Sequence, residues 1–101
     1  MRQRLKPETR RDQILSAALI LAEAQHYADI TRDDIAHKAG VSMGLVTHHF
    51  GSMVQLRRAL MRFAVQQECV PVVAQGLASR DAHALKAPDA LKERAARHLI
   101  A

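Results

Sequence analysis

Cysteines, aromatic residues and chain-breaking residues are all scarce in this sequence of 101 residues. The single cysteine, Cys69, excludes an intramolecular disulfide and a CxxC metal-binding pair, and it suits a reducing compartment. One tyrosine, two phenylalanines and no tryptophan leave the aliphatic residues and methionine to form a core. Because alanine is abundant, glycine and proline are few and β-branched runs are nearly absent, the composition predicts an all-α fold.

A long hydrophobic run is also missing. The basic residues 1–6 are not followed by the apolar region of a signal peptide. The most apolar stretch, residues 14–22, contains Ser16 and is far shorter than a bilayer requires. We therefore expect a cytoplasmic protein with no membrane partner.

The residues needed for catalysis or metal binding do not form a pattern either. No Ser-His-Asp set, paired carboxylates or glycine-rich phosphate loop stands out, so we expect no enzymatic activity. His48 and His49 are adjacent and point apart, whereas helical metal ligands usually lie four residues apart with an acidic partner. We expect neither a metal nor a cofactor.

Positive charge is concentrated at the N-terminus. The formal net charge is +5, and residues 1–12 hold five basic residues against two acidic ones, whereas residues 13–51 have an acidic excess. A basic arm, residues 1–8, ahead of a nearly neutral body indicates an anionic partner, either nucleic acid or a membrane surface. The same pattern also fits a solvated surface with some excess arginine. A protein that binds a membrane surface would need a basic amphipathic helix with aromatic anchors, which this sequence lacks, so no membrane partner is expected.

Helix signals divide the next part of the chain into three segments. A helix over residues 7–26 is indicated by a proline in its first turn and an apolar stripe with helical spacing. Residues 31–40 begin with a Thr-x-x-Asp capping box and end at Gly40, which suits a left-handed C-terminal cap. Ser42 is a good N-cap for a third helix over residues 43–49. These helices form a predicted head, residues 9–52.

The rest of the chain, residues 53–101, is predicted to form two or three C-terminal helices. A fourth helix begins after the capping box at Ser52 and runs to about Cys69, because Pro71 cannot continue it. The apolar residues 70–77 form either a short helix or a strand, and the lack of a partner strand favours the helix. A turn is expected at 76–81, the stretch 77–87 could join either neighbour, and Pro88 begins a last helix.

Residues 32–51 have the layout of a helix-turn-helix. Ala36 lies four residues before Gly40, where two helices must approach closely, and Gly40 makes the turn. Val46, six residues after Gly40, faces back onto the first helix of the pair. A connection of three or four residues forces the steep crossing that presents the second helix to a DNA groove. A plain helical bundle with a tight corner has the same spacing.

A series of short motifs resembles the DNA-binding domain of the tetracycline-repressor (TetR) family over about residues 9–60. The resemblance implies a three-helix head whose third helix lies in the major groove, in a homodimer that binds palindromic double-stranded DNA operators and usually represses. The motifs are Ala17-Ala18 with Leu21, Tyr27, Ile30-Thr31, Asp34-Ile35-Ala36, Ala39-Gly40-Val41-Ser42, Gly44 and His49-Phe50-Gly51-Ser52.

The chain also departs from the family's pattern. His26 replaces a usual glycine, Thr47 a usual tyrosine, and Met53-Val54 a usual Lys-Glu pair. The family's tyrosine and lysine contact phosphates, so we expect weaker backbone contacts, for which the basic arm can compensate. About thirty residues follow residue 70, too few to enclose a small-molecule pocket of the usual size. We therefore expect no small-molecule inducer, in either a compact regulator or a fragment of a longer one.

Candidate DNA contacts lie on the third helix, at the start of the second helix and in the basic arm. Side chains on the outer face of the third helix can contact bases, a helix N-terminus can hold a phosphate, and arm residues can follow the backbone or enter the minor groove. For some of these residues, packing, helix capping or a passive tail is the alternative role. The set is Thr31, Arg32, Ser42, Met43, Gly44, Leu45, Thr47, His48, Arg4, Lys6 and Arg10.

Two functions remain open at this point. The first is a dimeric, nucleoid-associated repressor that binds its operator through residues 42–49, and the second is an interaction module that heterodimerises with a longer regulator. The homodimer is expected because the apolar residues of the C-terminal region exceed what a three-helix head can cover. These residues are Leu60, Phe63, Val70, Val72, Val73, Leu77, Leu91, Leu99 and Ile100.

Overall fold

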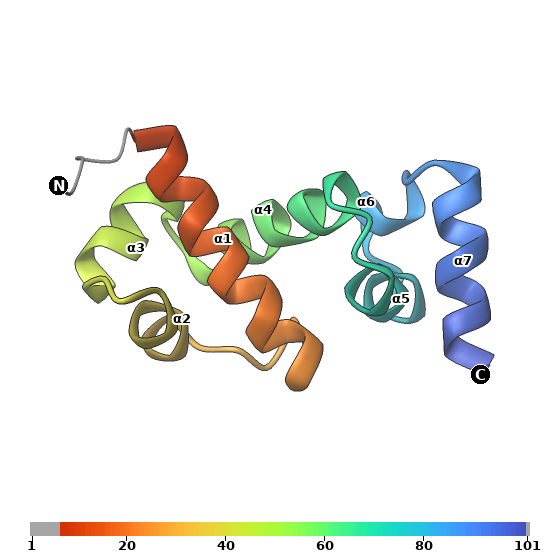
Figure 1. Cartoon of the computed structure of the whole chain (residues 1–101), viewed down its shortest axis with the longest axis horizontal. Coiled ribbons are helices and arrows are strands. Elements are labelled where there is room, and N and C mark those ends of the chain that lie inside the picture. The colour runs from red at the N-terminus through yellow and green to blue at the C-terminus, as the bar shows by residue number, and fades with distance from the viewer. Residues whose placement is uncertain (1–6, 101) are drawn as a thin grey trace, which may run out of the picture.

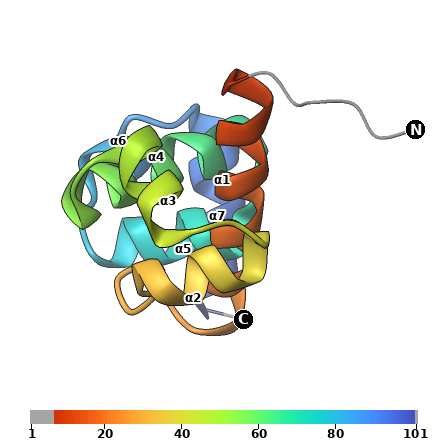
Figure 2. The same cartoon turned by 90° about the vertical axis from the view of Figure 1, so that its left-hand side faces the viewer.

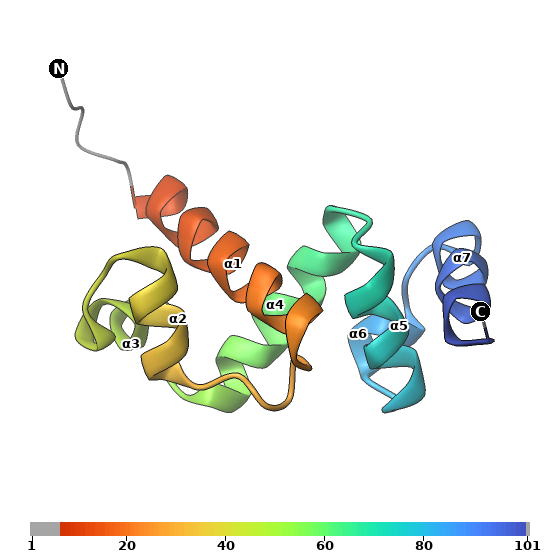
Figure 3. The ribbon, with the colours of Figure 1, turned by 60° about the horizontal axis from the view of Figure 1, so that its bottom comes forward.

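The computed structural model describes residues 7–100, and all regular elements in that range are helices (Figure 1). An elongated molecule of 43 × 26 × 21 Å carries α1–α3 at one end and α7 at the other (Figures 1 and 3). The all-α prediction is confirmed. The helices are α1 (Pro7–Ala24), α2 (Arg32–Ala39), α3 (Met43–Phe50), α4 (Met53–Gln66), α5 (Val70–Ala78), α6 (Ala82–Leu85) and α7 (Asp89–Ile100).

Local capping determines where the head helices begin and end. Thr31 forms the predicted capping box, because its Oγ1 accepts a hydrogen bond from the Asp34 amide at 3.1 Å while Asp34 Oδ2 accepts one from the Thr31 amide at 3.4 Å. Gly40 is left-handed with φ 71°, and the following Val41 amide donates to the Ala36 carbonyl at 3.0 Å. The two helices of the predicted motif are therefore separated by a tight glycine corner.

One continuous hydrophobic core includes residues of the head and of the C-terminal helices. In α1 the side chains of Ile14 and Ala18 are completely buried, and Leu60 and Met61 of α4 are buried equally. The same cluster continues to Ala95 in α7. None of the helices in the described range is long and apolar enough to cross a membrane.

Gln75 of α5 joins the C-terminal helices to the end of α1. Its Nε2 donates to the Ala22 carbonyl at 2.8 Å, and its Oε1 accepts from the Tyr27 amide at 2.9 Å. Both backbone groups lie where α1 ends and would otherwise lack helical partners. Beside them the Cys69 thiol donates to Glu23 at 2.9 Å, and burial followed by this bond raises the pKa of the thiol to about 11.

His26, which replaces the family's usual glycine, lies in the turn after α1. Its Nδ1 accepts a hydrogen bond from the Ala28 amide at 3.1 Å, and its ring stacks on Tyr27 with 4.9 Å between centroids. A side chain thus takes part in the turn between α1 and α2.

Several predicted boundaries are wrong. Helix α4 ends at Gln66 rather than near Cys69, because Glu68 takes a left-handed conformation with φ 52° and turns the chain. Pro71 lies in the first turn of α5, where a proline is tolerated, and does not itself stop α4. The undecided segment after residue 70 is a helix, as favoured.

The expected turn at residues 76–81 is shorter than predicted. Gly76 is a buried residue inside α5, which continues to Ala78. The unassigned stretch that follows contains the four-residue helix α6, so four helical segments follow the head instead of two or three. Asp81 caps α6, since its Oδ1 accepts from the amides of His83 and Ala84 at 2.9 and 3.2 Å.

The basic arm must also be redrawn, because α1 begins at Pro7 and residues 7–8 belong to that helix. The predicted DNA contacts Arg4 and Lys6 lie outside the described residues.

The surplus of apolar residues that supported a dimer is largely covered within one chain. Packing among α4, α5, α6 and α7 buries Leu60, Phe63, Val72, Val73 and Leu91 completely or nearly so. Val70 and Leu77 are half-buried against the same core, which leaves only Leu99 and Ile100 of the predicted set exposed. The sequence argument for the dimer interface was therefore wrong for most of its residues.

Gly76 offers a test of the packing between α4, α5 and α6. A Cβ atom added there would lie 2.7 Å from both the Ala84 Cβ and the Met61 Cε. The Met61 methyl can move, whereas the Ala84 Cβ cannot move without its helix. We expect Gly76→Ala to lower the free energy of unfolding by about 1–3 kcal/mol, measured by urea denaturation.

The matched control is Gly44→Ala, also a helical glycine, where the nearest atom to an added Cβ is the Ser42 Oγ at 3.8 Å. This variant should be neutral or stabilising by up to about 1 kcal/mol. Equal stability of both variants would contradict the packing described for α5.

Candidate nucleic-acid interface

Helix α3 has one buried face and one exposed face, and it lies at an end of the molecule. Figure 2 views the molecule from this end, with α3 in front. Val46 is completely buried, which confirms that it faces inward, and Phe50 is 7% exposed and also belongs to the core. The exposed residues of the predicted set are Ser42, Met43, Gly44, Thr47 and His48. Leu45 was expected on the same outer face but is half-buried, at the border of the core.

Two exposed hydroxyl groups mark the starts of α2 and α3. The Thr31 Oγ1 accepts from the Asp34 amide, and the Ser42 Oγ accepts from the Leu45 amide at 3.0 Å. A hydroxyl that accepts a capping bond still has its own proton to donate. Both groups therefore cap their helices and can donate at the same time to an anion such as a phosphate.

Arg32 has a structural contact that the sequence did not predict. The side chain is half-buried, and its Nη2 donates to the Gly51 carbonyl at 3.2 Å, joining the start of α2 to the residue after α3. Its Nε is buried and has no hydrogen-bond partner among the described residues. Arg32 thus helps to hold α3 in place, and its contact with a phosphate stays a prediction.

The middle of the exposed face of α3 combines apolar and polar groups. The Thr47 Oγ1 donates to the Met43 carbonyl at 3.1 Å, so its proton is used inside the helix while its lone pairs remain available. The His48 imidazole is exposed, and it meets His49 edge-on with 5.4 Å between ring centroids. Met43 is 50% exposed. This face can make both apolar and hydrogen-bonding contacts.

Gly44 leaves a gap in the exposed face of α3. An added Cβ would meet nothing closer than 3.8 Å, so the fold itself does not require glycine at this position. A glycine that packing does not require allows another molecule to approach the backbone closely.

Positive charge from α1 reaches the C-terminal end of α3. The Arg11 guanidinium lies 5.0 Å from the centroid of the Phe50 ring. The pKa of His49 is lowered, first by burial and then by the nearby charges of His48, Arg11 and Arg10. Arg10, a predicted DNA contact, also donates to Gln13 at 3.0 Å. Sequence reasoning missed this link between α1 and α3, because only the fold brings the two segments together.

The α2–corner–α3 arrangement, with α3 exposed along one face, is a helix-turn-helix. Residues 14–60 match the family model described as bacterial regulatory proteins, tetR family. The resemblance to that family is therefore confirmed over residues 14–60, a segment that extends from α1 into α4.

Two curated relatives, both from Pseudomonas putida, match about half of this chain. Over 54 residues the chain is 41% identical to the HTH-type transcriptional regulator SrpR. The aligned segment is 54% of this chain and 25% of SrpR. Over 51 residues the chain is 41% identical to the uncharacterized HTH-type transcriptional regulator TtgW. This aligned segment is 50% of this chain and 38% of TtgW. The matches thus span well under half the length of these relatives. No solved structure matches the chain.

Val46 and His48 test which face of α3 is inside. Val46→Asp places a carboxylate in a completely buried site without a partner, so the head should unfold. His48→Ala removes an exposed ring and should change the free energy of unfolding by no more than about 0.5 kcal/mol. Circular dichroism during thermal denaturation distinguishes the two. A Val46→Asp variant that melts like the unmodified chain would show that α3 is oriented differently.

Proposed function

We propose that this chain is a sequence-specific DNA-binding transcriptional regulator, acting as a dimeric repressor of a palindromic operator. The observation that carries the proposal is the exposed face of α3 at one end of the molecule, together with the capped N-termini of α2 and α3. The helix-turn-helix geometry allows such a face to enter the major groove while the flanking helix starts meet the backbone.

The exposed residues divide into those that contact bases and those that contact the backbone. Met43, Thr47 and His48, with Leu45 at the border, face the base edges; apolar groups suit the thymine methyl and the imidazole can donate to a base acceptor. Gly44 lets the helix backbone come close. The contacts proposed for the phosphates are those of Thr31, Arg32, Ser42, Arg10, Arg4 and Lys6.

Repression without an inducer completes this proposal. The TetR-type domain supports repression, because the family usually acts in this way. A pocket of about 360 Å³ between α4 and α7 has mostly exposed lining residues, with only Leu91 fully buried. An apolar effector needs a pocket that encloses most of its surface, and this surface depression does not provide one. Binding to chromosomal DNA would place the protein in the cytoplasm, associated with the nucleoid.

The shape of the chain is compatible with a two-fold dimer on DNA. Helices α3 and α7 lie at opposite ends of the 43 Å axis, and the two shorter dimensions are 26 and 21 Å. Half-sites one helical turn apart require recognition helices about 34–36 Å apart. Two chains standing side by side can meet this spacing, with exposed apolar residues of α7, Leu99 and Ile100, near the two-fold axis.

Gly44 and His48 test the DNA contact directly. Gly44→Ala should keep the fold, yet weaken binding about tenfold or more, because its methyl group would stand between α3 and the DNA. His48→Ala should lose about 1–3 kcal/mol of discrimination at one base position. Binding is measured by fluorescence anisotropy at fixed salt, on duplexes selected from a random library with the unmodified chain.

Arg97→Ala, an exposed change on α7, is the control and should bind as the unmodified chain does. Unchanged affinity and base preference in both α3 variants would refute α3 as the DNA-contacting helix.

The oligomeric state distinguishes this proposal from the alternative, an interaction module that pairs with a longer regulator. Sedimentation equilibrium at micromolar concentration should give the mass of two chains. Leu99→Glu should give one chain with an unchanged circular dichroism spectrum, because Leu99 is 49% exposed and contributes little to the core. A single-chain mass of the unmodified protein that persists as the concentration rises would favour the interaction module.

A further inference from the structure

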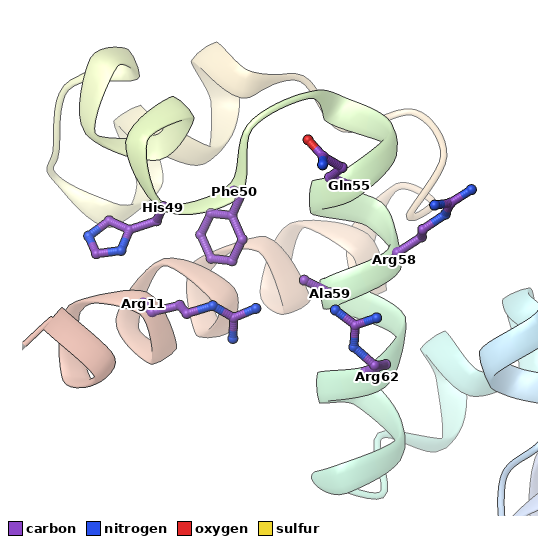
Figure 4. Close-up of a pocket in the computed structure, with 7 residues that line it drawn as sticks. All are labelled: Arg11, His49, Phe50, Gln55, Arg58, Ala59 and Arg62. Atoms are coloured by element: carbon purple, nitrogen blue, oxygen red, sulfur yellow. The ribbon is translucent and has the colours of Figure 1, made fainter.

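A basic pocket of about 240 Å³ lies beside the C-terminal end of α3, between α1 and α4 (Figure 4). Three arginines line it, Arg11 from α1 and Arg58 and Arg62 from α4. The Arg11 and Arg62 side chains point toward each other on either side of Ala59, whereas Arg58 points away (Figure 4). The small, buried Ala59 leaves the space between the two guanidinium groups open.

Among residues 9–100, no carboxylate forms an ion pair with an arginine of this pocket. The ion pairs found among the described residues are Lys92–Asp89, Arg94–Glu68 and Arg97–Glu93, and all three involve α7. Arg94 and Arg97 at the α7 end therefore have acidic partners, while the arginines of the pocket have none among residues 9–100. Two guanidinium groups facing each other repel unless an anion lies between them.

The pocket supplies more than charge. The Phe50 ring holds the Arg11 guanidinium at 5.0 Å, which orders one arginine before any ligand arrives. Gln55 Oε1 already accepts from the Ser52 amide at 2.9 Å, so the Nε2 of the same side chain is the end left to donate. His49, whose neutral form is favoured by burial and by the surrounding cations, completes one wall.

We propose that this pocket binds a phosphate group held between the guanidinium groups of Arg11 and Arg62. A guanidinium presents paired N–H donors that match the oxygens of a phosphate, and two such forks from different helices enclose a tetrahedral anion. The phosphate has two possible sources, the DNA backbone or a free phosphate-bearing anion. Because the Arg11 guanidinium packs on the ring of Phe50, a phosphate bound to Arg11 also contacts, through that arginine, the buried residue at the C-terminal end of α3.

The first test uses no DNA, so it stands apart from the proposed function. Sodium phosphate is titrated into the full chain at constant ionic strength maintained with sodium chloride, and the ¹H–¹⁵N spectrum is followed. We expect saturable shifts at Arg11, His49, Phe50 and Arg62, with an imidazole pKa of His49 that rises when the anion is bound.

Arg62→Gln should weaken phosphate binding at least tenfold while keeping the fold, because Arg62 is exposed. The matched control is Arg97→Gln, also exposed but paired with Glu93, and it should bind phosphate as the unmodified chain does. Equal phosphate affinity of the two variants would overturn a site built on Arg62.

The second test identifies the source with a selected duplex. If the phosphate belongs to DNA, Arg62→Gln should reduce the slope of log K against log salt by about 0.9, and phosphate should compete with the duplex. If the anion is free, the slope stays the same and phosphate binds in the presence of DNA. An unchanged slope together with no saturable phosphate shifts would refute the site.

Discussion

Helix α4 packs against other helices on two sides, and the arrangement of those helices depends on this double packing. Leu56, Leu60 and Met61 are buried, and α4 contacts α1 and α3 toward the head and α5 and α6 toward the other end. The head therefore does not close its own core; it shares one with the C-terminal helices. The hydrogen bonds of Gln75 strengthen the same junction, so the position of α3 is tied to helices far along the chain.

A second consequence is the uneven distribution of charge. At the α7 end the arginines Arg94 and Arg97 have acidic partners, whereas no carboxylate of residues 9–100 pairs with the pocket arginines Arg11, Arg58 and Arg62. Exposed ion pairs contribute little to stability, but they offset the charges of these two arginines. The arginines without such partners lie instead beside the C-terminal end of α3. An anionic group is therefore attracted to this pocket.

Features of the fold encoded by local sequence were predicted well. The caps at Thr31, Ser42 and Ser52 and the left-handed Gly40 are all present, because each depends on residues within one turn of helix. Features that need distant contacts were missed. Nothing local shows that Gly76 lies against Ala84, or that Arg11 reaches Phe50. The apolar residues of the C-terminal region were assigned to a dimer, since hydrophobicity shows that a side chain is covered but not by which chain. Helix α3 could be predicted from the spacing of residues in one short segment. The basic pocket beside it could not, because its lining residues come from three helices.

Chemical-shift mapping tests most directly whether the exposed face of α3 contacts DNA. A ¹⁵N-labelled sample of the full chain is titrated with a duplex selected from a random library. The largest amide shifts should fall at Thr31 and from Ser42 to His48, with smaller ones near Arg10 and Arg11. Shifts concentrated in α5 to α7, with α3 unaffected, would contradict the account.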